Sequence, residues 1–556
     1  MNQTSEPPAH PSAGPLAPLR VASFRRIWSA SLVSNSGHLI LGVAAAWEMT
    51  RLTDSPQMIA LVQTALMVPL MLVALPAGAL ADMFDRRKIA LVGLCVASLM
   101  GAGLTVISFA DLTTPWLLLG FLVLIGGGVA LYGPAWQASI GELVPLSQLP
   151  SAVALGSVSY NLARSVGPAV GGLIVTLLGT RYAFGASACG YLVLAAAFVL
   201  WRRQTVPARL PPESFGRALV SGFRYARHAN GVRNVVIRAF AFGLSGATAI
   251  ALAPLIARDL LSGGPTTYGV LLGASGVGAV GGSLMTSWVR DRLGPEWAIR
   301  LLIVASGAAL SGIAFSRSLP VTCACFVVIG AGNMTVVSML NVGVQLSSPR
   351  WVTARALSLF TSALTGGVAI GSWAYGAAVT GFGLELVIAV SGGSLAATAL
   401  LGFILPLRRE SEADRQPAEL SSEPDVALAV TMRSGPIAIS IDYRVDPEHA
   451  RDFYLAMQAV RTSRMRNGAF GWAITRDIAD PWMWTERYDC PTWGDYLRLR
   501  DRFTAADREA QTRADAYNTL DGARRVRRGL ERPFGSVRWQ ADTPDPRQPE
   551  TGVYTP

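Results

Sequence analysis

About twelve apolar stretches, each about 20 residues long, occupy roughly the first 400 residues of the 556-residue chain, and they restrict its fold more than any other feature. A stretch of this length can cross the hydrocarbon core of a bilayer as a helix. The sequence therefore predicts an all-α polytopic membrane protein with the lipid bilayer as its surroundings. The expected spans are residues 27–49, 57–81, 89–109, 116–138, 152–178, 183–201, 236–257, 268–289, 299–316, 321–346, 356–380 and 384–406.

The distribution of charge agrees with a membrane protein and argues against a nucleic-acid partner. Only 15% of residues are charged, whereas soluble proteins average about 25%. The formal net charge of +11 comes from arginines placed between the apolar stretches, not from one basic block. Loops rich in arginine mark the cytoplasmic side of a membrane protein. They predict a multi-pass membrane protein with both termini in the cytoplasm, as an even number of spans also requires. The arginine-rich composition suggests a bacterium, so the expected location is the bacterial cytoplasmic (inner) membrane.

The longest loop between spans divides the membrane part into two sets of about six helices, the layout of transporters built from two halves. The predicted boundaries are a disordered tail at 1–19, a first six-helix half at 20–201, a central cytoplasmic loop at 202–235, a second six-helix half at 236–407, a linker at 408–435, a cytoplasmic α+β domain at 436–540 and a disordered tail at 541–556.

The C-terminal part has the pattern of a small soluble domain. Alternating apolar residues from Ile437 to Val445 predict a strand, and Asp446 with Pro447 predicts the start of a helix that ends at Gly468. A hairpin at 472–488, a helical region at about 493–518 and a last strand near 534–539 complete a β-α-β-β-α-β order. This order predicts a ferredoxin-like α+β fold.

The segment that follows the second span carries a signature. Its sequence, GALADMFDRRK over 78–88, resembles the G-x-L-A-D-x-x-G-R-[RK]-[RK] loop of the major facilitator superfamily, although Asp85 replaces the usual glycine. A related Asp-Arg pair, Asp291 and Arg292, follows the eighth span. The resemblance implies a two-half transporter fold with a cytoplasmic gate formed by Gly78, Asp82, Arg86, Arg87, Asp291 and Arg292. The alternative is that these arginines only fix the topology.

A Gly-Pro element lies in the fifth span. Gly167, Pro168, Gly171 and Gly172 resemble the G-P-x-x-G-G motif in the fifth helix of facilitator-superfamily antiporters that export. Proline bends a helix, and glycines allow another helix to approach closely. The resemblance favours export over import, although small residues at a four-residue spacing are common in membrane helices.

Residues 20–405 as a whole resemble the branch that contains the enterobactin exporter and the transmembrane secretion effectors. The supporting segments include Phe24–Trp28, Gly133–Ala135 and Glu142–Pro145. Residues 436–540 are similar to the α+β domains of antibiotic-biosynthesis monooxygenases, which implies a dimer through this domain. Several tryptophans there could line a ligand pocket or belong to the core and a dimer interface.

Polar residues inside apolar spans are candidates for a substrate or proton path, because a charge at the bilayer centre costs about 2.5–3.5 kcal/mol on insertion scales. Arg164 could bind an anionic substrate or pair with an acid on another helix, and His38 could carry a proton or only hold helices together. The candidate path comprises His38, Asn35, Asn161, Arg164, Gln137, Asn341 and Gln345.

No cofactor, metal site or catalytic constellation is predicted. The five cysteines have neither metal-ligand nor disulfide spacing, and the sequence contains no phosphate-binding G-x-x-x-x-G-K-[ST] loop. The predicted function is non-enzymatic. The resemblance to the facilitator-superfamily exporters implies secondary active export of a drug, siderophore or secondary metabolite by alternating access, with protons moving in the opposite direction. Two alternatives stay open, an uptake permease of the same fold and a transporter fused to a domain that binds or oxidises a small molecule.

Overall fold

The structure is a computed structural model that describes residues 16–145, 148–201, 224–225, 229–348, 352–407, 426–428, 430–520 and 525–531. It divides into two compact units. The first is a helical bundle that includes most of the chain up to Leu407, and the second contains the α+β domain together with two short segments, Val220–Arg233 and Gln345–Ala356.

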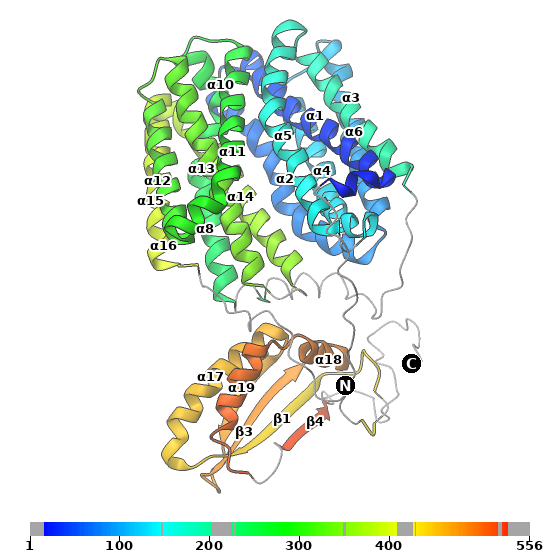
Figure 1. The fold of residues 1–556 in the computed structure, drawn as a ribbon, viewed down its shortest axis with the longest axis vertical. Helices are drawn as coiled ribbons and strands as arrows, with labels where there is room; N and C mark the ends of the chain where they lie inside the picture. Colours follow the sequence, from blue (N-terminus) through cyan, green and yellow to red (C-terminus); the bar gives the residue numbers. More distant parts are fainter. Residues whose placement is uncertain are drawn as a thin grey trace, which may run out of the picture. The chain divides into compact units, whose positions relative to one another are not determined.

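The first half of the bundle consists of six long helices joined by short turns, preceded by the short helix η1 (Ala17–Arg20) (Figure 1). Because the turns are short, consecutive helices run antiparallel. Helix α1 packs on α5 and α6, and α3 packs on α4 and α6. The helices are α1 (Ala22–Leu52), α2 (Pro56–Met83), α3 (Arg86–Phe109), α4 (Pro115–Leu143), α5 (Leu149–Leu177) and α6 (Thr180–Val199).

The second half repeats this plan with two broken helices. Its first helix is interrupted where Pro254 removes a backbone hydrogen bond, and it ends in a π-helical turn. The elements are α8 (Asn230–Gly246), α9 (Thr248–Ala251), α10 (Ala253–Leu255), η3 (Ile256–Leu260), α11 (Pro265–Leu293), α12 (Pro295–Ile313), α13 (Leu319–Leu346), α14 (Thr353–Phe382), α15 (Leu384–Ala397), η4 (Thr398–Leu400) and α16 (Leu401–Ile404).

The bundle has two ends. The end at which α1 begins and α16 finishes is called the terminal end below, and the opposite end, with the α1–α2 and α5–α6 turns, is called the distal end. Polar side chains start several helices by accepting a backbone N–H: Ser55 starts α2 and Thr114 starts α4 at the distal end, and Asp85 starts α3 at the terminal end.

Ten of the helices are long and apolar enough to cross a membrane, judged on the residues that the structure describes. Helices α1 and α5 are not among the ten, although they are 31 and 29 residues long and cover two further predicted spans. Helices therefore lie over all twelve predicted stretches, ten of which meet the apolar criterion.

The α+β domain has a four-stranded antiparallel sheet in the order β2-β3-β1-β4, with α17 and α19 against one face (Figure 1). In the register, Ile441 lies opposite Glu486 on one side and Val526 on the other. The elements are β1 (Ile437–Arg444), η6 (Pro447–His449), α17 (Ala450–Asn467), β2 (Phe470–Arg476), β3 (Met483–Cys490), α18 (Trp493–Asp501), α19 (Ala505–Asp515) and β4 (Arg525–Leu530).

One prediction for this domain is refined, and another falls on residues that the structure does not describe. The helical region expected at 493–518 is two helices, because Thr504 and Asp507 form a capping box that starts α19. The fourth strand is Arg525–Leu530, and the expected strand near 534–539 lies outside the described residues. Both predicted tails lie largely or wholly outside them too, as do most of the central loop and most of the linker.

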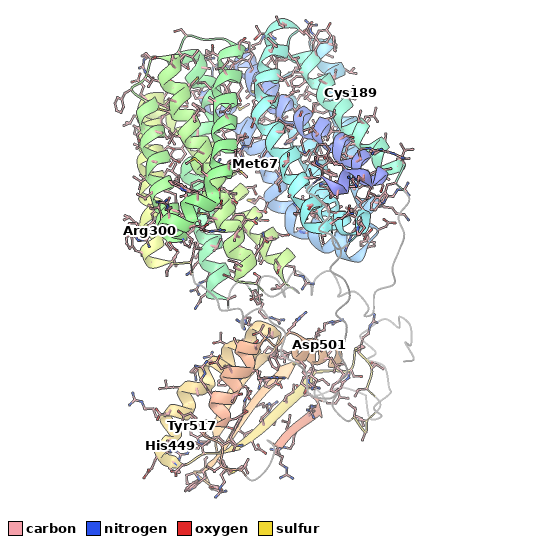
Figure 2. The ribbon with its side chains drawn as sticks, viewed as in Figure 1. Met67, Cys189, Arg300, His449, Asp501 and Tyr517 are labelled. Atoms are coloured by element: carbon pink, nitrogen blue, oxygen red, sulfur yellow. The ribbon has the colours of Figure 1, made fainter. Side chains whose placement is uncertain are left out.

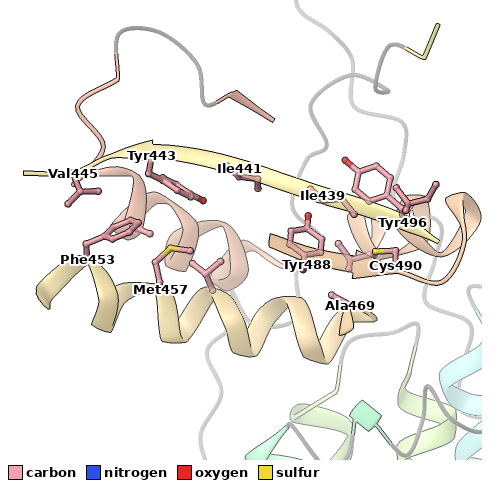
Figure 3. Packing of buried hydrophobic residues seen from close by; sticks show 14 residues of the cluster. Ile439, Ile441, Tyr443, Val445, Phe453, Met457, Ala469, Tyr488, Cys490 and Tyr496 are labelled. Carbon is pink, nitrogen blue, oxygen red and sulfur yellow. The ribbon is translucent and has the colours of Figure 1, made fainter. Parts of the chain in front are cut away.

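The core of the domain lies between the sheet and α17. Tyr443 and Phe453 pack with ring centroids 5.3 Å apart, and Met457 and Tyr488 are also buried there (Figure 3). At one end of the domain, His449 and Tyr517 lie side by side with ring centroids 6.1 Å apart (Figure 2). The strand and helix predicted at 437–468 are thus confirmed, and their apolar faces form this core.

Candidate functional site

The two halves of the bundle meet closely at the crossing of α5 and α11. A Cβ atom added at Gly172 would lie only 2.9 Å from the Gly269 Cα, so the backbones touch at a point where side chains do not fit. The Ser165 hydroxyl donates to the Gly276 carbonyl at 3.1 Å, and the Thr176 and Thr266 hydroxyls lie 2.7 Å apart. This crossing runs from the middle of α5 to the distal end.

A second contact between the halves joins α2 and α14. The Thr64 hydroxyl donates to the Ala369 carbonyl at 2.9 Å, and Gly376 lies against Ala60. At the distal end, Arg258 of η3 forms an ion pair of 3.4 Å with Asp54, which follows α1. The halves are therefore in contact at the distal end through both helix pairs.

The Gly-Pro element lies at this junction. Gly167 and Gly171 face α1, where added Cβ atoms would lie 3.1 Å from the Leu39 Cβ and 3.2 Å from the Ile40 Cα. Gly172 faces α11 of the other half. The motif thus lets α5 pack closely on two helices at once, one from each half.

Arg164 and Asn161 lie on α5 between these two packing faces. Positions 167 and 171 point to α1, positions 165 and 172 point to α11, and at 3.6 residues per turn Arg164 and Asn161 fall between them. In the part of α5 between Arg164 and the distal end, the exposed apolar side chains Val166, Leu173 and Leu177 lie on the opposite side of the helix. Arg164 and Asn161 therefore face the interior of the bundle.

Neither polar side chain is satisfied within the described part of the chain. Arg164 is half-buried and forms no ion pair or side-chain hydrogen bond there. The Asn161 Oδ1 atom is buried and has no hydrogen-bond partner. Among the described residues of the bundle, Arg164 is the one charged side chain in the middle of a membrane helix that has no ion-pair or hydrogen-bond partner.

His38 and Asn35 are placed differently from Arg164. His38 Nδ1 lies 2.8 Å from the Tyr191 hydroxyl on α6, within the same half of the bundle. This contact joins α1 to α6 and supports the helix-packing alternative for His38. Asn35 is half-buried one turn earlier on α1.

The remaining path candidates lie on helices other than α5, which carries Arg164. Gln137 is exposed near the end of α4, whereas Asn341 and Gln345 lie in the last two turns of α13. Asn341 is half-buried and Gln345 is exposed. Arg164 and Asn161 are thus the two candidates whose shared orientation the helix contacts define.

The signature loop contributes to packing within the first half. Arg86 forms a 2.9 Å ion pair with Glu142 of α4, and Arg87 donates to the carbonyls of Phe198 and Val199 at 2.9 and 2.7 Å. The surroundings of Gly78 and the side chain of Asp82 are outside what the structure describes. In the second half, Asp291 pairs with the adjacent Arg290, and Arg292 lies over the Trp288 ring.

A charged cluster at the terminal end of the second half was not predicted. Arg238 of α8 forms a 2.8 Å ion pair with Glu296 of α12, and Arg300 donates to the Gly402 carbonyl at 2.7 Å (Figure 2). The Arg300 guanidinium also lies 3.8 Å from the centre of the Phe403 ring. The Glu296–Arg300 spacing of four residues is the only local signal for this cluster.

The α+β domain contains a buried ion pair. Arg464 of α17 donates to Glu486 of β3 at 3.1 Å, and Glu486 also accepts from Trp472 Nε1 at 3.0 Å and from the Tyr443 hydroxyl at 3.1 Å. Burial is the largest single influence and alone would lower the pKa of Arg464, but the Glu486 carboxylate, Tyr488 and Tyr443 together outweigh it and raise that pKa. These polar groups find their hydrogen-bond partners within the domain, so they have the character of a structural network.

Cys490 lies beside this network on β3. Its side chain is fully buried, and burial together with Asp495 and Asp489 raises the pKa of the thiol to about 12. Such a thiol is a poor nucleophile at neutral pH. Among the described residues no group of three His, Cys, Asp or Glu side chains could hold a metal ion.

Comparison with known proteins identifies the family. A family profile described as transmembrane secretion effector matches residues 13–534, which include both the bundle and the α+β domain. The chain belongs to the transmembrane secretion effector family. As a transmembrane secretion effector it is a membrane transporter with the facilitator-type fold, and that part of the predicted identity is confirmed.

Relatives of this transmembrane secretion effector include efflux proteins. The chain is 24% identical over 393 residues to the multidrug efflux pump Tap of Mycobacterium tuberculosis, covering 68% of this chain and 93% of Tap. It is 23% identical over 299 residues to macrolide efflux protein A of Streptococcus pyogenes, covering 53% and 72%.

Solved structures agree on the fold. The nucleoside transporter NupG superposes with a TM-score of 0.57 at 13% identity, over 69% of this chain and 100% of NupG. At this identity the likeness concerns the fold alone.

Proposed function

We propose that this protein is a secondary active exporter of small molecules that works by alternating access, with protons moving inward as substrate moves outward. The observation that carries this proposal is the α5–α11 crossing, where Gly172 meets Gly269. A backbone contact without side chains between the halves allows one half to rock on the other. The efflux function of the relatives Tap and macrolide efflux protein A supports the outward direction.

All twelve predicted helices cross the cytoplasmic membrane in this proposal, and the terminal end faces the cytoplasm. Five basic residues lie at the terminal end, as the positive-inside rule requires of a cytoplasmic side: Arg25, Arg26, Arg86, Arg87 and Lys88. The signature loop with Asp82 closes this end in one state of the cycle, and the contacts at the distal end close the other side in the opposite state.

The α+β domain is cytoplasmic in this proposal and has a ferredoxin-like fold. Its outer sheet face carries polar pairs such as Asp442–Arg527, whose atoms lie 3.0 Å apart, and offers a surface for a second copy. Trp472 and Trp484 pack against the core, which supports a role in packing and dimerisation over one in oxidation.

Transport in everted membrane vesicles tests the proposal. With an imposed pH gradient, vesicles with the wild-type protein should accumulate members of a panel of macrolides, siderophores and dyes, and a protonophore should abolish the accumulation. Asp82→Asn should reduce it if the signature loop is a gate. Accumulation in right-side-out vesicles instead would establish uptake, and no transport by correctly inserted protein would overturn the proposal.

A further inference from the structure

Arg164 is exceptional among the charged residues of the bundle. It lies 15 residues after the first and 13 residues before the last residue of α5 (Leu149–Leu177). In the membrane helices that the structure describes, every other Asp, Glu, Lys or Arg lies within about ten residues of an end of its helix or span. A charge so far from either end cannot reach water by extending along the helix.

The direction of the Arg164 side chain rules out contact with lipid headgroups, which would be the simplest structural explanation for a charge at this position. Gly167 and Gly171 fix one face of α5 on α1, and Ser165 and Gly172 fix another on α11. Arg164 projects between these faces, and from Arg164 to the distal end the exposed apolar side of α5 (Val166, Leu173 and Leu177) lies opposite it. The side chain therefore faces the interior between the two halves.

The second observation is the state of the neighbouring amide. The Asn161 Oδ1 atom is buried without a hydrogen-bond partner, and buried polar atoms without partners are rare and costly. Asn161 lies three residues before Arg164, so both polar groups belong to the same side of the helix. A guanidinium with free donors beside an unsatisfied amide matches a ligand that carries an anion and a hydrogen-bonding group.

We propose that Arg164 and Asn161 form a binding subsite for a carboxylate on the transported molecule. The planar guanidinium binds a carboxylate through two parallel N–H···O bonds, and it keeps its charge at every physiological pH. Asn161 holds an adjacent hydroxyl or N–H group of the same molecule. This inference rests on the proposed transport function and adds a preference for organic acids.

Chemical modification tests the subsite without knowledge of the substrate. In the full-length protein with its five cysteines replaced by alanine, Asn161→Cys is treated with the negatively charged sulfonatoethyl and the positively charged trimethylammonium-ethyl methanethiosulfonates. Each rate is divided by the rate at a control position, Leu112→Cys, in the exposed α3–α4 turn. The anionic reagent should react about tenfold faster than the cationic one after this correction, a ratio that corresponds to about 1.4 kcal/mol.

Replacing Arg164 shows whether that residue is the cause. Arg164→Gln should abolish the preference for the anionic reagent, Arg164→Lys should retain most of it, and Arg181→Gln at the start of α6 should leave it unchanged. Benzoate should slow the modification of Asn161→Cys, whereas benzamide, which has the same shape without the charge, should not. These two compounds separate binding of a carboxylate from blockage by any aromatic molecule.

The outcomes separate this inference from the proposed function. An inaccessible Asn161→Cys, an equal rate for both reagents, or equal protection by benzoate and benzamide would overturn the subsite even if vesicles transport their substrates. Persistence of the preference for the anionic reagent in Arg164→Gln would assign that preference to another positively charged group, and it would also overturn the subsite. A charge preference without transport in vesicles would instead leave the subsite standing and contradict the exporter.

Discussion

Arg87 and Arg300 make equivalent contacts in the two halves of the bundle. Each lies in the first two turns of the third helix of its half, and each donates to backbone carbonyls at the end of the sixth. Arg87 Nε lies 2.9 Å from the Phe198 oxygen, and Arg300 Nη2 lies 2.7 Å from the Gly402 oxygen. The last carbonyls of a helix have no partner within it, so an arginine on a neighbouring helix satisfies them in both halves.

We expect Arg87→Gln and Arg300→Gln each to lower the free energy of unfolding by about 1–3 kcal/mol, because each leaves partly buried carbonyls without a strong donor. The adjacent and exposed Lys88 provides a matched control, Lys88→Gln, with little expected effect. Thermal unfolding of the purified protein in detergent measures the three changes. Equal stability of all three variants would contradict the capping role.

The closely packed glycine positions of the crossing between the halves should not tolerate a side chain. At Gly276 an added Cβ atom would collide with the Ser165 backbone, whereas at Gly281, on the same helix, nothing lies within 4 Å. Gly276→Ala should therefore reduce transport severely, and Gly281→Ala should not. Expression and unfolding temperature are measured in parallel, and normal transport by Gly276→Ala would show that α5 and α11 do not need this close contact.

The buried ion pair of the α+β domain should be more favourable for the stability of the domain than either of its charges buried alone. Arg464→Met leaves Glu486 buried without its cation and should destabilise the domain by about 3–5 kcal/mol. The double variant Arg464→Met with Glu486→Leu should recover most of this loss, since it removes both charges. Resistance of the C-terminal unit to limited proteolysis reports the difference, and a double variant as labile as the single one would contradict the account.

Alkaline pH should destabilise the α+β domain through Cys490. Its pKa is raised from the ordinary 9.0 to about 12 in the folded domain, so the folded state binds a proton that the unfolded state releases. The stabilising effect is complete below about pH 9 and is lost as the pH rises toward about 12. Urea unfolding at about pH 8 and about pH 10.5 measures how far the free energy of unfolding falls with rising pH. The fall should be smaller in Cys490→Ala, and an unchanged fall would exclude this thiol as a cause.

The sequence predicted the features whose signals are local. Span positions follow from apolar stretches, the strand and helix at 437–468 follow from their alternating and helical patterns, and the Gly-Pro element follows from its own spacing. Helices α1 and α5 do not meet the apolar criterion for a membrane span. In α5 the residues that lower the mean hydropathy include Asn161 and Arg164, which form the candidate site.

Features that depend on distant partners could not be predicted. Arg238 pairs with a residue 58 positions away, and Arg300 binds a carbonyl 102 positions away. For His38 the sequence left a proton carrier and a helix-packing residue as alternatives, and the contact that supports packing is with Tyr191, 153 positions away. Gly172 could be identified as a contact site, but its partner Gly269 is defined only by the fold.

Distances between spin labels at the two ends of the bundle test the central claim most directly. One pair, Lys88→Cys with Arg290→Cys, joins the halves at the terminal end, and another, Leu112→Cys with Arg317→Cys, joins them at the distal end. During exchange of a transported substrate in nanodiscs, the distal pair should lengthen as the terminal pair shortens. Distances that stay fixed, or that change in the same direction, would contradict alternating access between two rocking halves.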